Sequence, residues 1–314
     1  MFKGRAPTTF FKRIRNNAII FREMLKLRNQ YDVFHFNFGT TLLDFPQYHL
    51  PLLDLPLYKE KGKIIVTYNG SDARQKIIDE RVIKKYRLDD TKIKRINFEV
   101  DNDAYKREKI QKFDRYADAI FALNPDLLYF LPGRAQFLPY SISSWNEIRE
   151  VPPKNIMDRI VFLHAPTSRA LKGSDIIIDV FNRIRSEYGD RVVLELVENK
   201  SHSEALALFS RADVIIDQLL IGWYGGLSVE VMKMGKPVIA FIREEDLHFI
   251  PPAMAEDCKN AFIRADPLTL YDRVIEIIEN PGLLQRYREK GIAYVNKWHD
   301  PEYIAGIAKK AYEL

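Results

Sequence analysis

The sequence predicts an α/β protein built on parallel β-sheets, and two observations carry this prediction. Short runs rich in Val, Ile and Phe recur along the 314 residues, and helical patterns separate them. The runs show almost no polar alternation at their centres, which is typical of strands that helices cover on both faces of a parallel sheet. Strand–helix alternation along the whole chain is typical of a doubly wound architecture.

The expected elements follow one another in a regular order. Strands are expected at Asp32–Phe38, Lys63–Tyr68, Ala117–Leu123, Arg159–His164, Arg191–Val197, Asp213–Asp217 and Lys236–Phe241. Helical patterns between the later strands cover Ser174–Arg185, Ser203–Ser210 and Val229–Met234. Residues 281–314 are almost wholly helical in pattern, and Pro301 stands where the first turn of the last helix accepts a proline.

One break divides this series. Ser141–Ser144 and Val151–Asn155 form a stretch rich in Ser and Pro that interrupts the periodicity, and a new strand–helix series starts at Asp158. The sequence therefore predicts two Rossmann-like domains, residues 1–145 and 158–297, that face each other across a cleft.

Composition and missing motifs limit the classes of function. Cys258 is the single cysteine, so an internal disulfide and a thiolate zinc site are excluded, and a reducing compartment is expected. The sequence contains no HExxH, GxSxG or GxxxxGK[ST] motif, and no GxGxxG follows its first strand. The common signatures of zinc hydrolases, serine hydrolases, P-loop proteins and dinucleotide-binding enzymes are thus missing. The acidic run Glu244–Asp246 is expected to be solvated.

Charge is concentrated at the N-terminus. The chain has 48 basic and 43 acidic residues, a net charge of +5, but residues 1–30 carry +7 and the other 284 residues carry −2. A basic pI that comes from one short segment does not indicate a nucleic-acid partner, and none is expected.

The basic segment has the pattern of an amphipathic helix. Apolar residues recur between its cations at three- and four-residue steps: Phe10, Phe11, Ile14, Ala18, Phe21 and Leu25. Two interpretations remain open, a helix on an anionic membrane surface and a surface helix with a solvated basic face. The apolar run is too short for a signal peptide, and no window approaches the roughly 18 apolar residues of a spanning helix. We therefore expect a cytoplasmic protein whose residues 1–30 can contact the inner face of the membrane.

Two cations follow the strand expected at Arg159–His164. Arg169 and Lys172 stand three residues apart in the loop that precedes the next helix. Ligands of open α/β sheets bind at the carboxyl ends of the strands, so this loop faces the expected site. Two adjacent cations suit a ligand with adjacent anionic groups such as a diphosphate, although a solvated pair of loop cations would show the same pattern.

A second motif follows the strand expected at Asp213–Asp217. Gly225-Gly226 opens a helix whose N–H groups and dipole can hold a phosphate. Glu230 lies one turn inside this helix, where its carboxylate can accept hydrogen bonds from two vicinal hydroxyls such as those of a ribose.

The order of these motifs resembles a known family. Arg-x-x-Lys-Gly, Ala-Asp-Val and Gly-x-x-x-Glu-x-Met-x-x-Gly-Lys-Pro-Val-Ile-Ala follow one another within residues 158–314. This order is similar to the donor half of family 4 glycosyltransferases of the GT-B fold, which are retaining, use nucleotide sugars and need no metal. The resemblance implies that Arg169 and Lys172 hold the donor diphosphate as catalytic residues and that Glu230 holds the ribose. It also implies donor contacts at Tyr224, Gly225, Gly226, Leu227 and Ser228, and a final helix, residues 298–314, that crosses back to the first domain.

Two departures from the family pattern stand out. The family's first glutamate falls at Gly222, so no carboxylate is expected there to touch the donor sugar. Either Asp217, Trp223 or Tyr224 reshapes this contact, or the activity is weakened or lost. In addition, the chain begins with a basic helix where the family has a strand and a glycine-rich acceptor loop. The first domain is therefore expected to be shortened at its N-terminus.

The acceptor side is expected at polar residues of the first domain. His35 and Asn37 end one strand, and Asn69 and Asp72 follow the next. These four residues are the candidates for acceptor or cleft contacts. A structural hydrogen-bonded role for His35 and a turn role for Asn69 and Asp72 remain open.

The resemblance implies transfer of a sugar from a nucleotide donor to a hydroxyl of a glycan or lipid-linked acceptor, in the synthesis of a surface polysaccharide or glycoconjugate. No cofactor and no metal is expected. Two alternatives remain open, namely a non-catalytic protein of the same fold that binds a nucleotide or a partner, and a nucleotide-sugar epimerase.

Overall fold

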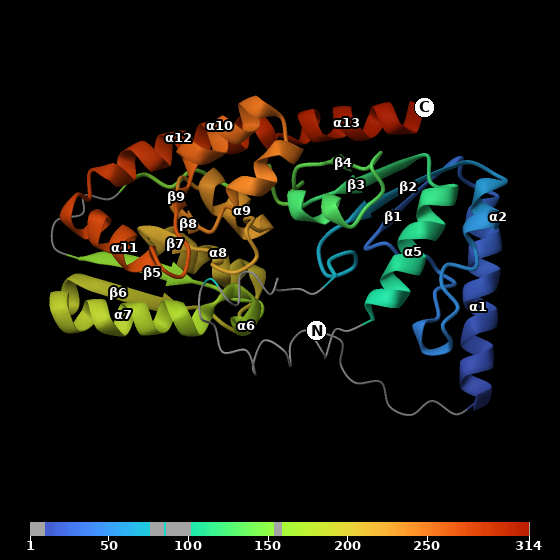
Figure 1. Ribbon diagram of the computed structural model, residues 1–314, viewed down its shortest axis with the longest axis horizontal. Helices are drawn as coiled ribbons and strands as arrows, with labels where there is room; N and C mark the ends of the chain where they lie inside the picture. The colour runs from blue at the N-terminus through green and yellow to red at the C-terminus, as the bar shows by residue number, and fades with distance from the viewer. Residues whose placement is uncertain (1–9, 76–84, 86–101, 154–158, 314) are drawn as a thin grey trace.

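The computed structural model describes residues 10–75, 85, 102–153 and 159–313. These residues form two α/β units, each built on one parallel sheet (Figure 1). All seven strands expected from the sequence are present, each within two residues of its expected ends.

The first sheet has the strand order β1-β2-β3-β4, and all of its neighbours are parallel. Its strands are β1 (Val33–Asn37), β2 (Lys63–Tyr68), β3 (Ala119–Ala122) and β4 (Gln136–Phe137). The surrounding elements are α1 (Phe10–Arg28), η1 (Pro46–Tyr48), α2 (Leu55–Lys59), α5 (Asp103–Tyr116) and η2 (Pro125–Tyr129). Met24 of α1 and Phe113 of α5 are fully buried against this sheet. With four strands against five in the second unit, the described part of the first domain is the smaller one.

The second sheet has the order β6-β5-β7-β8-β9, again with parallel neighbours. Its strands are β5 (Ile160–His164), β6 (Val192–Leu196), β7 (Val214–Ile216), β8 (Val238–Ala240) and β9 (Ile263–Arg264). Its helices are α6 (Arg169–Lys172), α7 (Ser174–Tyr188), η3 (Gly189–Arg191), α8 (His202–Arg211), α9 (Gly226–Lys233), η4 (Glu244–Phe249), α10 (Pro252–Ala261), α11 (Leu270–Glu279) and α12 (Leu283–Trp298).

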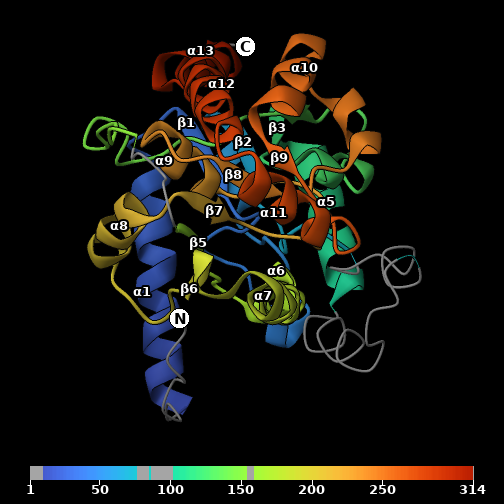
Figure 2. The ribbon, with the colours of Figure 1, turned by 90° about the vertical axis from the view of Figure 1, so that its left-hand side faces the viewer.

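Both faces of the second sheet are buried, which explains its continuous apolar strands. Phe162 packs toward α7 and α11, whereas the next residue, Leu163, packs toward α9, α10 and α12. Figure 2 shows α7 on one side of this sheet and α12 on the other. Successive side chains of a strand point to opposite faces, so one apolar run supplies two cores.

The last helix, α13 (Pro301–Glu313), leaves the second unit and lies along the first sheet (Figure 1). Its Ile304 and Ala311 are buried against Ile65 and Phe121. The Tyr312 hydroxyl lies 2.8 Å from Nδ1 of His35. This helix therefore connects the two units through apolar packing as well as through the chain.

The sequence predicts that the acidic run Glu244–Asp246 after β8 is solvated, and the structure differs at one of these residues. Glu244 and Glu245 are exposed, but Asp246 is fully buried in η4, so the interpretation of the whole run as solvated was wrong for this residue. The 3-10 turn points the third side chain of the run inward, where burial raises the pKa of Asp246 to about 6.

Candidate functional site

The N-terminus of α9 is built around a buried carboxylate. Asp217 follows β7, and its side chain is fully buried. Its Oδ2 accepts hydrogen bonds from the Gly225 N–H at 2.6 Å and from the Ser228 hydroxyl at 2.7 Å. The Lys172 ammonium forms an ion pair with Oδ1. We call these four residues the anion cradle, because three of them surround the anionic group of the fourth.

The electrostatics of the anion cradle stabilise the ionised form of Asp217. Burial alone would raise the pKa of Asp217, but the Lys172 ammonium and the bonds from Gly225 and Ser228 lower it below its usual value. The helix dipole acts in the same direction. The first N–H groups of a helix have no intrahelical acceptor, so those of Gly226 and Leu227 remain as donors for a further anion.

Arg169 lies on the same short helix as Lys172 but faces outward. Its guanidinium makes two bonds, of 2.7 and 2.6 Å, with the carboxylate of Glu198, and half of its side chain is exposed. The two cations expected together therefore share one helical turn and have separate acidic partners. Gly173, which follows this turn at φ +76°, takes the left-handed conformation that redirects the chain into α7.

Glu230 lies where α9, α8 and the segment between the domains, which we define as residues 138–153 after β4, meet. Its Oε1 is 2.9 Å from Nε2 of His202, the first residue of α8, and 3.4 Å from the hydroxyl of Ser144. Only 15% of the Glu230 side chain is exposed. A methyl group built on Gly226 would lie 3.6 Å from Ile142, so the connecting segment also lines the start of α9.

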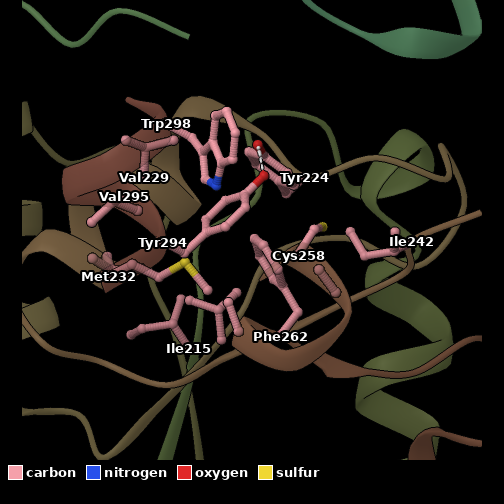
Figure 3. Close-up of a cluster of buried hydrophobic side chains, with 14 of the residues drawn as sticks. Ile215, Tyr224, Val229, Met232, Ile242, Cys258, Phe262, Tyr294, Val295 and Trp298 are labelled. Carbon is pink, nitrogen blue, oxygen red and sulfur yellow. Dashed lines mark hydrogen bonds between the residues drawn. The ribbon is translucent and has the colours of Figure 1, made fainter. Parts of the chain in front are cut away.

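Tyr224 is placed inside the core. Its ring stacks on Phe262 with centroids 4.7 Å apart (Figure 3), and its hydroxyl lies 2.7 Å from that of Tyr294 and 2.8 Å from Nε2 of His299. Any donor contact from Tyr224 is therefore left to its backbone, and its side chain holds the loop that precedes the anion cradle. His299 in turn lies 2.9 Å from the carbonyl of Tyr140, so this network reaches the segment between the domains.

The four acceptor-side candidates have different surroundings. His35 has both ring nitrogens engaged, with Tyr312 at 2.8 Å and with the Thr67 hydroxyl at 2.7 Å. Asn37, at the end of β1, is exposed. The structure thus ties His35 to α13, which is the structural role left open above, and leaves Asn37 accessible.

Asp72 and Asn69 belong to one turn. The Asp72 carboxylate accepts hydrogen bonds from the N–H groups of Asn69, at 2.9 Å, and of Gly70, at 2.6 Å. The carbonyl of Asn69 accepts from Asn124, whose amide oxygen accepts from the Tyr140 hydroxyl at 2.8 Å. This geometry is that of a capped turn tied to the segment between the domains.

A side chain at position 222 would fit neither the backbone conformation of Gly222 nor the space around it. Its φ is +82°, and a Cβ there would lie 3.0 to 3.1 Å from atoms of the Arg243 side chain. The place of the missing carboxylate is therefore covered by a cation.

Sequence reasoning named Asp217 only as a residue that could reshape the missing sugar contact, and it did not include His202, Ser144 and Arg243 among the site residues. Asp217 and Arg243 are polar residues just beyond the carboxyl ends of β7 and β8, which is a usable signal in a parallel sheet. His202 and Ser144 have no local signal, because only the tertiary fold brings them to Glu230.

Within the described ranges, no group of three or more His, Cys, Asp or Glu side chains could hold a metal ion. A search of the same residues finds no helix with the length and hydropathy needed to cross a membrane.

Comparisons with known proteins show similarity in structure. No family model matches the sequence, and no curated protein is similar to it. A sucrose-phosphate synthase from Thermosynechococcus elongatus aligns with 98% of this chain and 81% of its own, at 16% identity and a TM-score of 0.58. TarM aligns with 95% of this chain and 58% of its own, at 14% identity and a TM-score of 0.60.

A third solved structure is an α-glucosyltransferase in complex with UDP-glucose and DNA that contains an abasic site. It aligns with 94% of this chain and 83% of its own, at 13% identity and a TM-score of 0.56. At such identities the likeness concerns the fold, and it shows that the chain has the GT-B fold with two Rossmann-like domains.

Proposed function

We propose that the protein is a retaining glycosyltransferase that transfers a sugar from a nucleoside diphosphate sugar to a hydroxyl of a glycan or lipid-linked acceptor, in surface polysaccharide or glycoconjugate synthesis. The observation that carries the proposal is the anion cradle at the start of α9, with Glu230 one turn further along the same helix. The proposal is supported by a solved protein of the same fold, an α-glucosyltransferase in complex with UDP-glucose.

The described groups can stabilise a diphosphate leaving group. The donor phosphates would bind the N–H groups of Gly226 and Leu227 beside Lys172, and Arg169 would reach them from the surface by exchanging its partner Glu198. Positive charge held in place before the reaction stabilises the charge that develops on the departing diphosphate. A phosphate oxygen can then take the acceptor's proton on the same face of the sugar, which keeps the anomeric configuration. Glu230 would accept hydrogen bonds from the two ribose hydroxyls.

The Arg169→Ala variant tests this assignment. Arg169 is exposed and bonded to an exposed acid, so its removal is expected to leave the fold intact. Loss of one charge contact to the leaving group is expected to lower kcat/KM roughly 30- to 1000-fold. Donor consumption is followed by mass spectrometry over a panel of UDP, GDP and ADP sugars, with and without a glycan–lipid extract as acceptor.

The matched control is Arg185→Ala, which removes an exposed arginine from α7. Equal turnover of the Arg169 variant and this control would contradict the proposed role. Two further outcomes identify the alternatives. Binding of a nucleotide without consumption of any sugar donor would favour a non-catalytic protein. The missing carboxylate at Gly222 is the observation that motivates this alternative. Conversion of the donor to an isomer without acceptor would favour an epimerase.

The first helix supplies a candidate membrane contact for this enzyme. Ile19 and Phe21 of α1 are 52% and 45% exposed, and they flank the outward side of the helix, which carries Arg22 and Lys26. The buried Met24 and the 2.8 Å pair of Arg28 with Glu60 hold the end of the helix on the first domain, so point variants are preferable to truncation.

Wild type is expected to sediment with vesicles that contain anionic phosphatidylglycerol, and less so at high salt. The double variant Ile19→Ser with Phe21→Ser should bind them roughly tenfold more weakly, because it loses two apolar side chains. Leu268→Ser, at the exposed Leu268 of the second domain, is the control. Equal binding to neutral and anionic vesicles would contradict the contact.

A further inference from the structure

Arg243, between β8 and η4, packs against the loop that leads from β7 into α9. Its backbone N–H donates to the carbonyl of Gly222 at 2.9 Å, and its side chain covers the space where a Cβ of residue 222 would stand. Gly222 precedes Gly225 of the anion cradle by three residues. A cation is thus packed against Gly222, on the loop that leads to the proposed donor site.

The same side chain lines a pocket of the second domain. This pocket has a volume of about 640 Å³ and lies at the carboxyl ends of β8 and β9, the edge of the sheet that also holds Asp217. Tyr129 of the first domain lines it as well, so the pocket extends between the two domains. Its other charged lining residues are the cations Lys85, Lys259, Arg264 and Arg273 and the acids Glu244, Glu245, Asp246 and Asp266.

The Arg243 guanidinium has hydrogen-bonding capacity for a ligand. Its Nη1 donates to Asp246 at 3.4 Å, a long contact, and about a fifth of the side chain is exposed. A guanidinium carries five N–H donors in a planar fork that matches a carboxylate, more than this one contact uses. This contact anchors the Arg243 guanidinium to Asp246, whose own side chain is fully buried.

We infer that the transferred sugar carries a carboxylate, as in a hexuronate, and that Arg243 binds this group. The inference rests on the proposed function and names its substrate class. The family pattern has a carboxylate at position 222 to contact the hydroxyls of the sugar, and this chain has a guanidinium in its place. Reversal of charge at a sugar-binding position favours an anionic sugar over a neutral one. Glycine at position 222 leaves room for the Arg243 side chain, because any side chain there would displace it.

The test uses pairs of donors that differ only at C6. Binding of UDP-glucose and UDP-glucuronate, and of GDP-mannose and GDP-mannuronate, is measured by calorimetry on the full chain, with UDP and GDP alone as references. No acceptor is present, so a preference cannot come from an anionic acceptor. Wild type is expected to bind the uronate of one pair roughly 10- to 100-fold more tightly than its neutral partner.

Arg243→Gln should reduce this preference to about twofold or less, and Arg243→Lys should keep part of it, because the charge is retained. Neither substitution should change the affinity for the reference nucleotide, which also shows that the variant is folded. Arg273→Gln, at another cation of the pocket wall, is the matched control and should keep the preference.

Equal or weaker binding of both uronates by wild type would overturn the inference while leaving the proposed function in place. A preference that persists in Arg243→Gln would overturn the role of Arg243. Failure of these six ligands and of ADP to bind would contradict the proposed function and the inference together.

Discussion

Replacing Lys172 by Met is expected to abolish transfer and to lower the free energy of unfolding by about 3 to 5 kcal/mol. The loss of transfer follows from its place beside the N–H groups that would hold the donor phosphates. The loss of stability has a separate cause. Lys172 is the cation that pairs with Asp217, whose side chain is fully buried, so its removal leaves an uncompensated charge in the interior. Denaturant unfolding and donor turnover measure the two effects.

A second substitution separates the two effects. Asp217→Asn combined with Lys172→Met removes both charges and leaves an amide that can still accept from Gly225 and Ser228. This double variant should recover most of the stability and none of the turnover. Full activity in the double variant would contradict the role of Lys172, and an undiminished stability in Lys172→Met alone would contradict the buried pair.

Lowering the pH from 7.5 to 5.0 is expected to reduce the free energy of unfolding, with about 2 kcal/mol of the loss due to His299 alone. Burial lowers the pKa of His299 to about 4, against an ordinary value of 6.5. Between pH 6.5 and about 4, the unfolded chain therefore binds a proton at His299 that the folded chain does not bind. The contribution of His299 is complete above pH 6.5 and is lost as the pH falls toward 4.

The variant His299→Gln isolates this contribution. An amide can donate to the Tyr140 carbonyl and accept from the Tyr224 hydroxyl without titrating. Burial also lowers the pKa of His35 and His164, which act in the same direction as His299. The raised pKa of Asp246 acts in the opposite direction, so the wild-type profile alone is not diagnostic. The difference between wild type and variant should shrink by about 2 kcal/mol between the two pH values. An unchanged difference would contradict a neutral, buried His299.

The fold was predictable because its strands are covered on both faces. Runs such as Ile160–His164 have no polar face and read directly as parallel strands. The sequence did not predict β4 and β9, because two-residue strands carry no periodicity. The start of α9 was signalled by its glycines, whereas its apolar pattern begins only at Val229.

The part of the proposed site that lies on loops after neighbouring strands was predictable. Lys172 follows β5 and Gly225 follows β7, and these two strands are paired, so their loops meet at one edge. The direction of individual side chains was not predictable. Tyr224 stands between site residues in the sequence, yet packing against Phe262 and hydrogen bonding to His299 turn its ring into the core. Likewise, no local pattern indicates that Asp217 folds back onto the first turn of α9.

The most direct test of the donor site is a crystal structure of the full chain with the nucleoside diphosphate, among UDP, GDP and ADP, that it binds most tightly. The account predicts a phosphate within hydrogen-bonding distance of the N–H groups of Gly226 and Leu227 and of the Lys172 ammonium, with both ribose hydroxyls on the Glu230 carboxylate. A nucleotide bound elsewhere, or one whose ribose lies away from Glu230, would contradict it.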